Sequence, residues 1–244
     1  METSTTSDNG SASTERHSLV LDIVSDTICP WCFVAKRRLD RAIEEFEKEG
    51  HGVTTIWRPF ELNPQMPPEG LDRKAYRSAK FGSWEKSRSL DAGVIEASVD
   101  TSIEWDYDAM EKTPNTFGSH CLVRMAFEQG GADLQSDVIE RLFSAYFEQG
   151  RDVGDPSVLT DLAAEVAIEA GVFPEDSHTN SVAASVRGEL DIAERAQITG
   201  VPSVLAGKLF LYSGAQTVRI MVEALQLAAK SPQDAGPASS IYLS

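Results

Sequence analysis

The chain has 244 residues, of which 41% are hydrophobic, and a formal net charge of −16. A chain of this length can bury a sizeable core, and it can form one domain that carries a large insertion. Nucleic acids and anionic membrane surfaces are bound by basic faces, so this acidic balance argues against both as partners. No stretch approaches the length of a transmembrane helix.

Residues 1–18 predict a disordered N-terminal tail. They are rich in Ser and Thr and lack both the apolar core of a signal peptide and the Arg-rich character of an organellar transit sequence. Three cysteines, of which two are close in sequence, fit a reducing compartment where disulfides are transient and catalytic. We therefore expect a cytoplasmic protein, in which a paired-cysteine site reduces or isomerises disulfides rather than forming them.

Residues 19–48 predict a buried strand followed by an amphipathic helix, with two cysteines at the junction. The apolar, β-branched run at 19–24 is typical of a core strand, and residues 33–48 carry apolar side chains at helical spacing. Cys29-Pro30-Trp31-Cys32 therefore falls on the first turn of the helix, where the helix dipole and unpaired N–H groups favour a thiolate. Pro30 suits this position because it needs no N–H there. The spacing lets Cys29 and Cys32 close a small disulfide, with Cys29 the more exposed nucleophile.

Two other uses of this pair are compatible with its spacing. Structural zinc takes four Cys or His ligands, commonly in two close pairs, but the remaining cysteine is Cys121 and the four histidines are scattered. A purely structural disulfide would need neither Pro-Trp between the cysteines nor a helix N-terminus beneath them. The strand–CxxC–helix context favours a thioredoxin-like redox motif, and no metal site is expected.

The rest of the chain predicts a second strand, a long helical block and a final hairpin with a helix. Residues 53–58 read as a strand and 59–70 as a loop, while 71–190 show helical periodicity without a convincing strand. Helices are expected at 116–129, at about 138–148, and from Asp155-Pro156 to a stop at Gly171 with Pro174 beyond it. Residues 200–205 and 209–212 form a hairpin, and Ser213-Gly214-Ala215-Gln216 opens a last helix that runs to about Lys230.

This order predicts an α/β, thioredoxin-like fold interrupted by a large all-helical insertion. The thioredoxin-like domain comprises residues 19–70 and 191–230, and the insertion, or lid, comprises residues 71–190. Residues 231–244 are rich in Pro and Ser and are expected to form a loose C-terminal tail.

Val201-Pro202, just before a short apolar strand, is the second motif that bears on chemistry. In a thioredoxin-type site a cis proline lies against the CxxC pair and leaves neighbouring backbone groups free for an extended substrate. An isolated X-Pro bond is cis only about one time in twenty, and a trans proline at the start of an edge strand is the alternative. Together with the CPWC junction and the β–β–α ending, Pro202 is expected to be the cis proline of the site.

These segments resemble the DsbA-like oxidoreductases of the FrnE-type subfamily, which are related to kappa-class glutathione transferases and 2-hydroxychromene-2-carboxylate isomerases. The matching segments span residues 19–230 and are Asp26-Thr27-Ile28-Cys29-Pro30-Trp31-Cys32, Pro59-Phe60-Glu61-Leu62-Asn63-Pro64, Pro67-Pro68-Glu69-Gly70, Pro114-Asn115-Thr116 with Ser119-His120, Ala145-Tyr146-Phe147, Thr199-Gly200-Val201-Pro202-Ser203 and Ser213-Gly214-Ala215-Gln216.

The resemblance implies a thioredoxin fold with a helical lid. It implies that Cys29 is the attacking thiolate, that Cys32 resolves, and that Val201-Pro202 faces the substrate. His120 would face the site from the lid and tune Cys29 or shuttle a proton. Catalytic roles thus fall to Cys29, Cys32, Pro202 and His120, and substrate contacts to Pro30, Trp31, Val201, Asn63, Ser213 and Gly214.

Two positions depart from the family pattern. Ala35 stands where the family often has Gly, and Ala is a good helix residue. Cys121 stands where an Arg often follows the lid histidine. It is expected to be a small buried residue, the alternative being a thiol close enough to exchange with the CPWC pair.

The leading hypothesis is a thiol–disulfide oxidoreductase that works through a mixed disulfide, acts on a disulfide or thiol substrate, and has no permanently bound cofactor. The alternative is a glutathione-dependent isomerase or transferase for a small aromatic or polyketide-like compound. In that hypothesis Trp84, Trp105, Tyr107 and Phe117 roof an apolar pocket and the helix opened by Ser213 binds a glutathione carboxylate. A redox-responsive interaction module is a third option. Glutathione as co-substrate and a homodimer are both compatible with the sequence.

Overall fold

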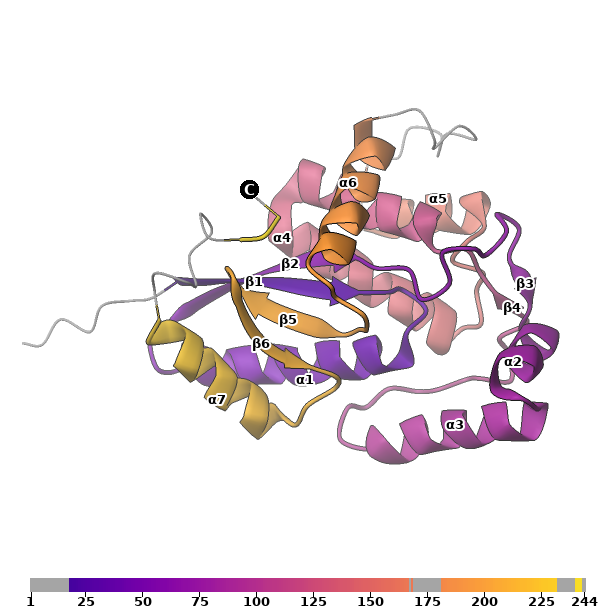
Figure 1. Cartoon of the computed structure of the whole chain (residues 1–244), viewed down its shortest axis with the longest axis horizontal. Helices are drawn as coiled ribbons and strands as arrows, with labels where there is room; N and C mark the ends of the chain where they lie inside the picture. Colours follow the sequence, from indigo (N-terminus) through magenta and orange to yellow (C-terminus); the bar gives the residue numbers. More distant parts are fainter. Residues whose placement is uncertain (1–17, 167, 169–180, 232–239, 243–244) are drawn as a thin grey trace, which may run out of the picture.

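The computed structural model describes residues 18–166, 168, 181–231 and 240–242. At its centre is a four-stranded sheet of order β2-β1-β5-β6 (Figure 1). The strands are β1 Ser18–Ser25, β2 Gly52–Pro59, β5 Ser203–Ala206 and β6 Leu209–Ser213. β1 and β2 are parallel and joined by α1 (Pro30–Glu47), whereas β1–β5 and β5–β6 pair antiparallel. The β–α–β and β–β–α halves expected from the sequence therefore share one sheet.

Helices cover both faces of this sheet and extend beyond one end of it. The remaining elements are β3 Leu71–Asp72, α2 Arg73–Phe81, α3 Trp84–Ala97, β4 Lys112–Thr113, α4 Phe117–Phe147, α5 Pro156–Glu165, α6 Ser181–Arg195 and α7 Val218–Ala229. In Figure 1, α1 and α7 lie on one side of the sheet and α6 on the other, while α2 and α3 are set apart from the strands. None of the helices in the described part of the chain is long and apolar enough to cross a bilayer.

The core gathers where α1, α4 and the sheet meet. Leu21, Ile23 and Val24 of β1 are almost fully buried, and because neighbouring side chains of a strand point to opposite faces, this central strand is covered on both faces. The Phe33 ring of α1 stacks on Phe143 of α4, with 5.2 Å between centroids, and on Phe147, with 6.0 Å. The apolar stripe that predicted a helix around residues 138–148 is therefore the face by which α4 packs against α1.

The insertion differs from the sequence prediction in three respects. It contains a strand pair, β3–β4, which is too short to leave a periodic pattern. The two helices expected at 116–129 and 138–148 are continuous in α4 except at Gly131, whose φ of +71° breaks the helical geometry. α5 ends at Glu165 rather than at Gly171, because Val166 has a non-helical ψ of 17°. Gly171, Pro174 and the N-terminal tail lie outside the described residues.

The last helix also begins later than predicted. α7 starts at Val218, and Thr217 caps it by accepting a hydrogen bond from the Ile220 N–H. Gly214 has a φ of +79° and cannot belong to a right-handed helix. Ser213 instead ends β6, so the prediction that residues 213–216 open the helix was wrong.

A side chain closes the outer edge of β2. Gln135 of α4 accepts a hydrogen bond from the Trp57 N–H (2.8 Å) and donates one to the Trp57 carbonyl (3.0 Å), as a neighbouring strand would. The amide thereby satisfies two buried backbone groups that an edge strand otherwise leaves open. It also fixes α4 against the sheet.

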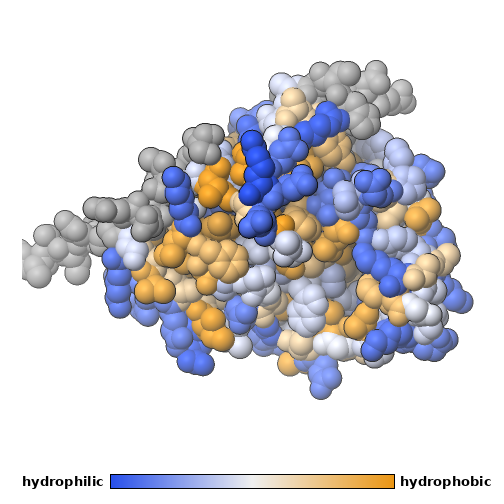
Figure 2. Space-filling model, viewed as in Figure 1, coloured by the Kyte–Doolittle hydropathy of each residue, from blue (hydrophilic) through white to orange (hydrophobic). Residues whose placement is uncertain are grey.

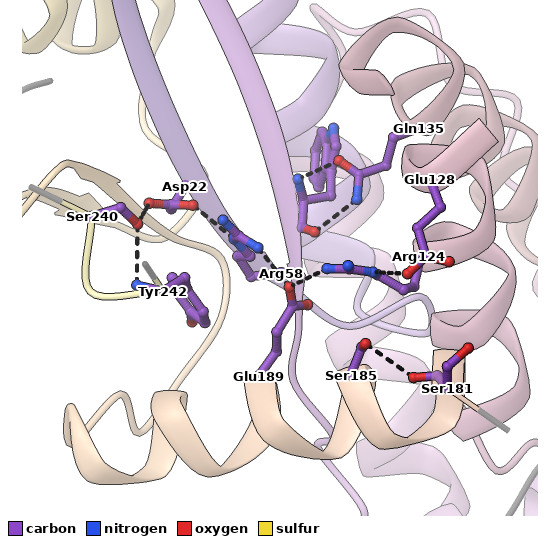
Figure 3. A network of polar contacts seen from close by, with 11 residues as sticks. Asp22, Arg58, Arg124, Glu128, Gln135, Ser181, Ser185, Glu189, Ser240 and Tyr242 are labelled. Carbon is purple, nitrogen blue, oxygen red and sulfur yellow. Dashed lines mark hydrogen bonds and ion pairs between the residues drawn. The ribbon is translucent and has the colours of Figure 1, made fainter. Parts of the chain in front are cut away.

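Residues 240–242 pack against the sheet, although the sequence predicts a loose tail there. The Ser240 hydroxyl donates to the Asp22 carboxylate (2.6 Å), and the Tyr242 ring lies 4.5 Å from the Arg58 guanidinium carbon (Figure 3). Arg58 also donates to Asp22 (2.7 Å) and to Glu189 of α6 (2.5 Å). The C-terminal segment therefore covers a buried ion cluster that joins β1, β2 and α6.

The visible surface in Figure 2 mixes polar and apolar side chains, with apolar side chains over the region of β6 and α7. Phe210 of β6 and Leu227 of α7 are more than half exposed. The homodimer with which the sequence is compatible stays a prediction.

Candidate active site

Cys29 and Cys32 are placed by the end of β1 and the start of α1. Cys29 is the N-cap of α1, and Pro30 occupies its first turn. The Cys29 N–H donates to the Asp26 carbonyl (3.0 Å), and the Cys29 carbonyl accepts from the Cys32 N–H (3.0 Å). Both cysteines are free thiols in this structure. No acidic residue lies in the first turn of α1, so the positive end of its dipole is left for the cysteines.

The two thiols have different surroundings. Both side chains are buried, but Cys29 is 4% exposed and lines a cavity, with its Sγ 3.8 Å from the Val201 carbonyl oxygen, whereas Cys32 is 0% exposed and does not line that cavity. Burial raises the pKa of the Cys32 thiol well above its usual value, and the hydrogen bond with Cys29 raises it further. An incoming sulfur can therefore reach Cys29 first, while Cys32 stays protonated behind it.

The Val201–Pro202 peptide bond is cis, as the sequence analysis expected. The Pro202 carbonyl accepts hydrogen bonds from the Gly214 N–H (2.8 Å) and the Ser213 hydroxyl (3.1 Å). Ser213 and Gly214, predicted to contact substrate from a helix N-terminus, thus support the proline loop from the end of β6.

His120 lies behind the cysteine junction and is buried. Its Nε2 is 3.0 Å from the Phe60 carbonyl oxygen and therefore donates to it, and the Asp26 carboxylate lies 3.7 Å away. Asp26 is itself buried and accepts the Leu62 N–H (2.7 Å). Burial raises the pKa of nearby Glu61, and His120 partly opposes that rise. His120 is therefore joined to the site through Asp26 and the 60–62 loop, and its part in proton transfer stays a prediction.

A cavity of about 480 Å³ opens beside Cys29, within the size range of small-molecule sites. One wall comes from the thioredoxin part and includes the predicted residues Pro30, Trp31, Asn63 and Val201. The opposite wall comes from α2 and α3 of the insertion and consists of Tyr76, Arg77, Lys80, Phe81, Ser89, Leu90, Asp91, Gly93 and Val94.

A buried arginine of α1 connects this helix to the end of α3, which forms part of the cavity wall. Arg38 of α1 donates to the carboxylate of Asp100 (2.6 Å), just after α3, and to the Ala97 carbonyl (2.5 Å) at the end of α3. It also donates to the Ala215 carbonyl (2.9 Å) beyond β6. One side chain thus holds the insertion and the β6–α7 loop in a fixed relation to α1.

The aromatic residues expected to roof the pocket lie elsewhere. Trp105 stacks on Tyr107 (5.3 Å) and packs edge-on against Phe33 and Phe147, so both rings belong to the core. Trp84 covers the buried guanidinium of Arg73, with 5.5 Å to its ring centroid, and Phe117 packs against the main core. Trp84, Trp105 and Tyr107 also line a separate cavity of about 210 Å³, and the aromatic lining beside Cys29 consists of Trp31, Tyr76, Phe81 and Tyr146.

Cys121 is buried in α4, and burial raises its pKa to about 12. It therefore stays a neutral thiol at physiological pH, which suits packing rather than nucleophilic attack. Among the described residues, no three His, Cys, Asp or Glu side chains gather in a way that could hold a metal ion.

Replacing Cys121 by alanine should leave the rate of disulfide exchange within about twofold of wild type. The substitution removes one buried sulfur and leaves a small cavity, so we expect a loss of roughly 1 kcal/mol in unfolding free energy. Exchange rates with a small disulfide and urea denaturation measure the two effects. Complete loss of exchange in a folded Cys121→Ala protein would show instead that this thiol takes part.

The sheet, the dithiol at a helix N-terminus and the cis proline beside it define a thioredoxin-fold dithiol protein. The sequence model of the DSBA-like thioredoxin domain matches residues 20–226, so the chain belongs to this family. It is 28% identical over 188 residues to the uncharacterized protein YwbO of Bacillus subtilis, which covers 77% of this chain and 86% of that protein. The predicted fold and family resemblance are thereby confirmed.

Solved structures agree with this assignment. The probable DsbA oxidoreductase SCO1869 of Streptomyces coelicolor is 25% identical, with a TM-score of 0.75 over 87% of this chain and 90% of that chain. At 17% identity, the cytosolic disulfide reductase DsbM of Pseudomonas aeruginosa with GSH has a TM-score of 0.57 over 88% and 98% of the two chains. A 2-hydroxychromene-2-carboxylate isomerase is 13% identical, with a TM-score of 0.62 over 89% of this chain and 100% of that chain. The last two likenesses concern the fold alone.

Proposed function

We propose that the protein is a thiol–disulfide oxidoreductase in which Cys29 attacks and Cys32 resolves. The observation that carries the proposal is the asymmetry of the pair. Cys29 lines a cavity at the N-terminus of α1, and Cys32 lies one turn behind it, fully buried. A thiol that meets the substrate and a second thiol that only the first can reach are what a mixed-disulfide mechanism needs.

The steps follow from this arrangement. The Cys29 thiolate attacks a substrate disulfide, forms a mixed disulfide and releases one thiolate. Cys32 then loses its proton and attacks the Cys29 sulfur, which releases the second thiolate and closes the Cys29–Cys32 disulfide. Because the pKa of Cys32 is raised, Cys32 stays protonated during the first step and does not compete with Cys29. The second step needs the Cys32 thiolate, so it should become faster as pH rises.

Trapping the intermediate tests this assignment. A Cys32→Ser variant mixed with oxidised glutathione should accumulate a stable glutathione adduct on Cys29, because no second thiol is left to release it. Intact mass and peptide mapping identify the adduct. An adduct that forms mainly on Cys121, or equally fast after the protein is denatured, would contradict the assigned roles.

We also propose glutathione as co-substrate and the cytoplasm as the compartment. The cavity beside Cys29 is large enough for a tripeptide, and a structural neighbour of the same fold, DsbM, is known in a structure with GSH, which supports this proposal. The low number of cysteines, two of which form the dithiol pair, and the similarity in fold to a cytosolic disulfide reductase, DsbM, support a reducing compartment.

A glutathione-dependent isomerase or transferase is the second candidate, and the mainly apolar lining of the cavity favours it. The resolving thiol Cys32 has no use in that chemistry. Full activity on a small electrophile by a Cys32→Ser variant would support the second candidate over the first.

A further inference from the structure

The cavity beside Cys29 has a polar group at its outer end that the disulfide chemistry does not use. Tyr76 and Lys80 of α2 and Asn63 of the loop after β2 line this cavity, and the same three residues line a second cavity of about 540 Å³. The Tyr76 hydroxyl donates to the Asn63 side-chain carbonyl (2.5 Å), and the Lys80 ammonium donates to the same oxygen (2.5 Å). The three side chains therefore form one hydrogen-bonded bridge between the two spaces.

Lys80 and Asn63 keep hydrogen-bond donors that are not paired with an anion. Within the described residues, Lys80 makes no ion pair, and its partners are the neutral oxygens of Asn63 and Tyr76. The Asn63 side-chain oxygen accepts both of these hydrogen bonds, and its amide N–H groups make no hydrogen bond to the described residues. An ammonium and an amide, both donors, thus stand together at a cavity wall without an anion.

The charged groups around the cavity reinforce this feature. The charged lining residues are Arg77, Lys80 and Asp91, and Asp91 also pairs with the buried Arg73 (2.7 Å) as well as with Arg77 (2.6 Å). Two cations, Arg77 and Lys80, therefore line the cavity with one carboxylate, Asp91, which the buried Arg73 also neutralises from outside the cavity, in a chain whose net charge is −16. A partly enclosed site with a surplus of positive charge attracts anions more strongly than the same charges on an open surface.

The other lining side chains are mainly apolar and include Ile28, Trp31, Leu62, Phe81, Leu90 and Val94. They favour a substrate with an apolar body between its sulfur and its charged end. The volume of about 480 Å³ suits a small molecule.

We propose that Lys80 and Asn63 form a carboxylate-binding subsite, which makes small disulfides with an apolar spacer between sulfur and carboxylate the preferred substrate class of Cys29. The inference rests on the proposed oxidoreductase function and adds the residues that select the substrate. The substrate accepts two electrons: its S–S bond breaks, Cys29 and Cys32 form theirs, and the two leaving thiolates take up the two protons that the cysteines release.

Dithiodipropionate and its bis-amide test the subsite, because they differ in charge but hardly in shape. The rate constant for oxidation of the reduced protein by each is followed by tryptophan fluorescence and checked by thiol titration. We expect Lys80→Met to lower the rate with dithiodipropionate roughly three- to tenfold and to leave the bis-amide rate unchanged. Lys80→Arg should keep most of the preference for dithiodipropionate over the bis-amide. Added salt should reduce this preference in the wild type and in Lys80→Arg but not in Lys80→Met.

Lys74→Met is the matched control, since Lys74 lies exposed on the same helix and lines neither cavity. It should change the two rates by less than twofold and equally. The subsite is ruled out if Lys80→Met changes both rates alike or neither rate, or if Lys74→Met has the same effect as Lys80→Met. If neither disulfide oxidises the wild-type dithiol, the oxidoreductase proposal itself fails, which is a distinct outcome.

Discussion

Replacing Cys29 by serine is expected to lower the rate of disulfide exchange by roughly a thousandfold or more. A serine hydroxyl does not ionise at neutral pH and cannot form a disulfide, so the first step is lost rather than slowed. Cys29 also lines the cavity that a substrate sulfur would enter, and Cys32 is fully buried and cannot replace it. The measurement is turnover of a small disulfide with reduced glutathione as the electron donor.

Cys121→Ser is the control for that experiment, because it makes the same chemical change at a buried cysteine outside the pair. It should retain most of the exchange activity. Circular dichroism and urea denaturation establish that each variant is folded. Substantial turnover by a folded Cys29→Ser protein would refute the assignment of the attacking thiol.

Replacing Arg58 by methionine is expected to destabilise the fold by about 3–5 kcal/mol. Arg58 is buried between Asp22 of β1 and Glu189 of α6, and it lies under the Tyr242 ring (Figure 3). Its removal leaves two buried carboxylates, of which Glu189 keeps a contact with Arg124 (3.1 Å) and Asp22 keeps the Ser240 hydroxyl. Urea denaturation of the variant and the wild type gives the difference in unfolding free energy.

Arg219→Met provides the comparison. Arg219 pairs with Glu223 on the surface of α7, and both side chains are more than half exposed. An exposed pair of this kind contributes about 0.3–0.5 kcal/mol, so the variant should unfold almost as the wild type does. Equal effects of the two substitutions would show that the buried cluster does not hold the C-terminal segment and α6 to the sheet.

The sequence predicts the thioredoxin part because its signals are local. β1 is an apolar run interrupted only by Asp22 between residues 19 and 24, Cys29-Pro30 marks the start of α1, and Gly207 marks the turn between β5 and β6. The late start of α7 was missed, although Thr217 is a good N-cap, because Ser213-Gly214 also resembles a helix start. The two-residue strands β3 and β4 gain stability only from long-range pairing, which no local pattern reports.

The candidate site divides in the same way. Cys29, Cys32 and Pro202 lie within recognisable motifs, whereas Tyr76, Arg77 and Lys80 reach the cavity only because α2 folds back toward α1. Their spacing on one face of a short helix was the available signal, but an amphipathic face does not say what it meets. Trp84, Trp105 and Tyr107 were assigned to the pocket for their ring type, and packing against Arg73, Phe33 and Phe147 holds them elsewhere.

The reduction equilibrium of the Cys29–Cys32 pair tests the central claim most directly. The protein is equilibrated in buffers of reduced and oxidised glutathione, and its redox state is followed by tryptophan fluorescence and by thiol alkylation with mass analysis. We predict one reversible two-electron transition, present in Cys121→Ala and absent in Cys29→Ser and Cys32→Ser. If no Cys29–Cys32 disulfide forms at any glutathione ratio, the oxidoreductase account is wrong.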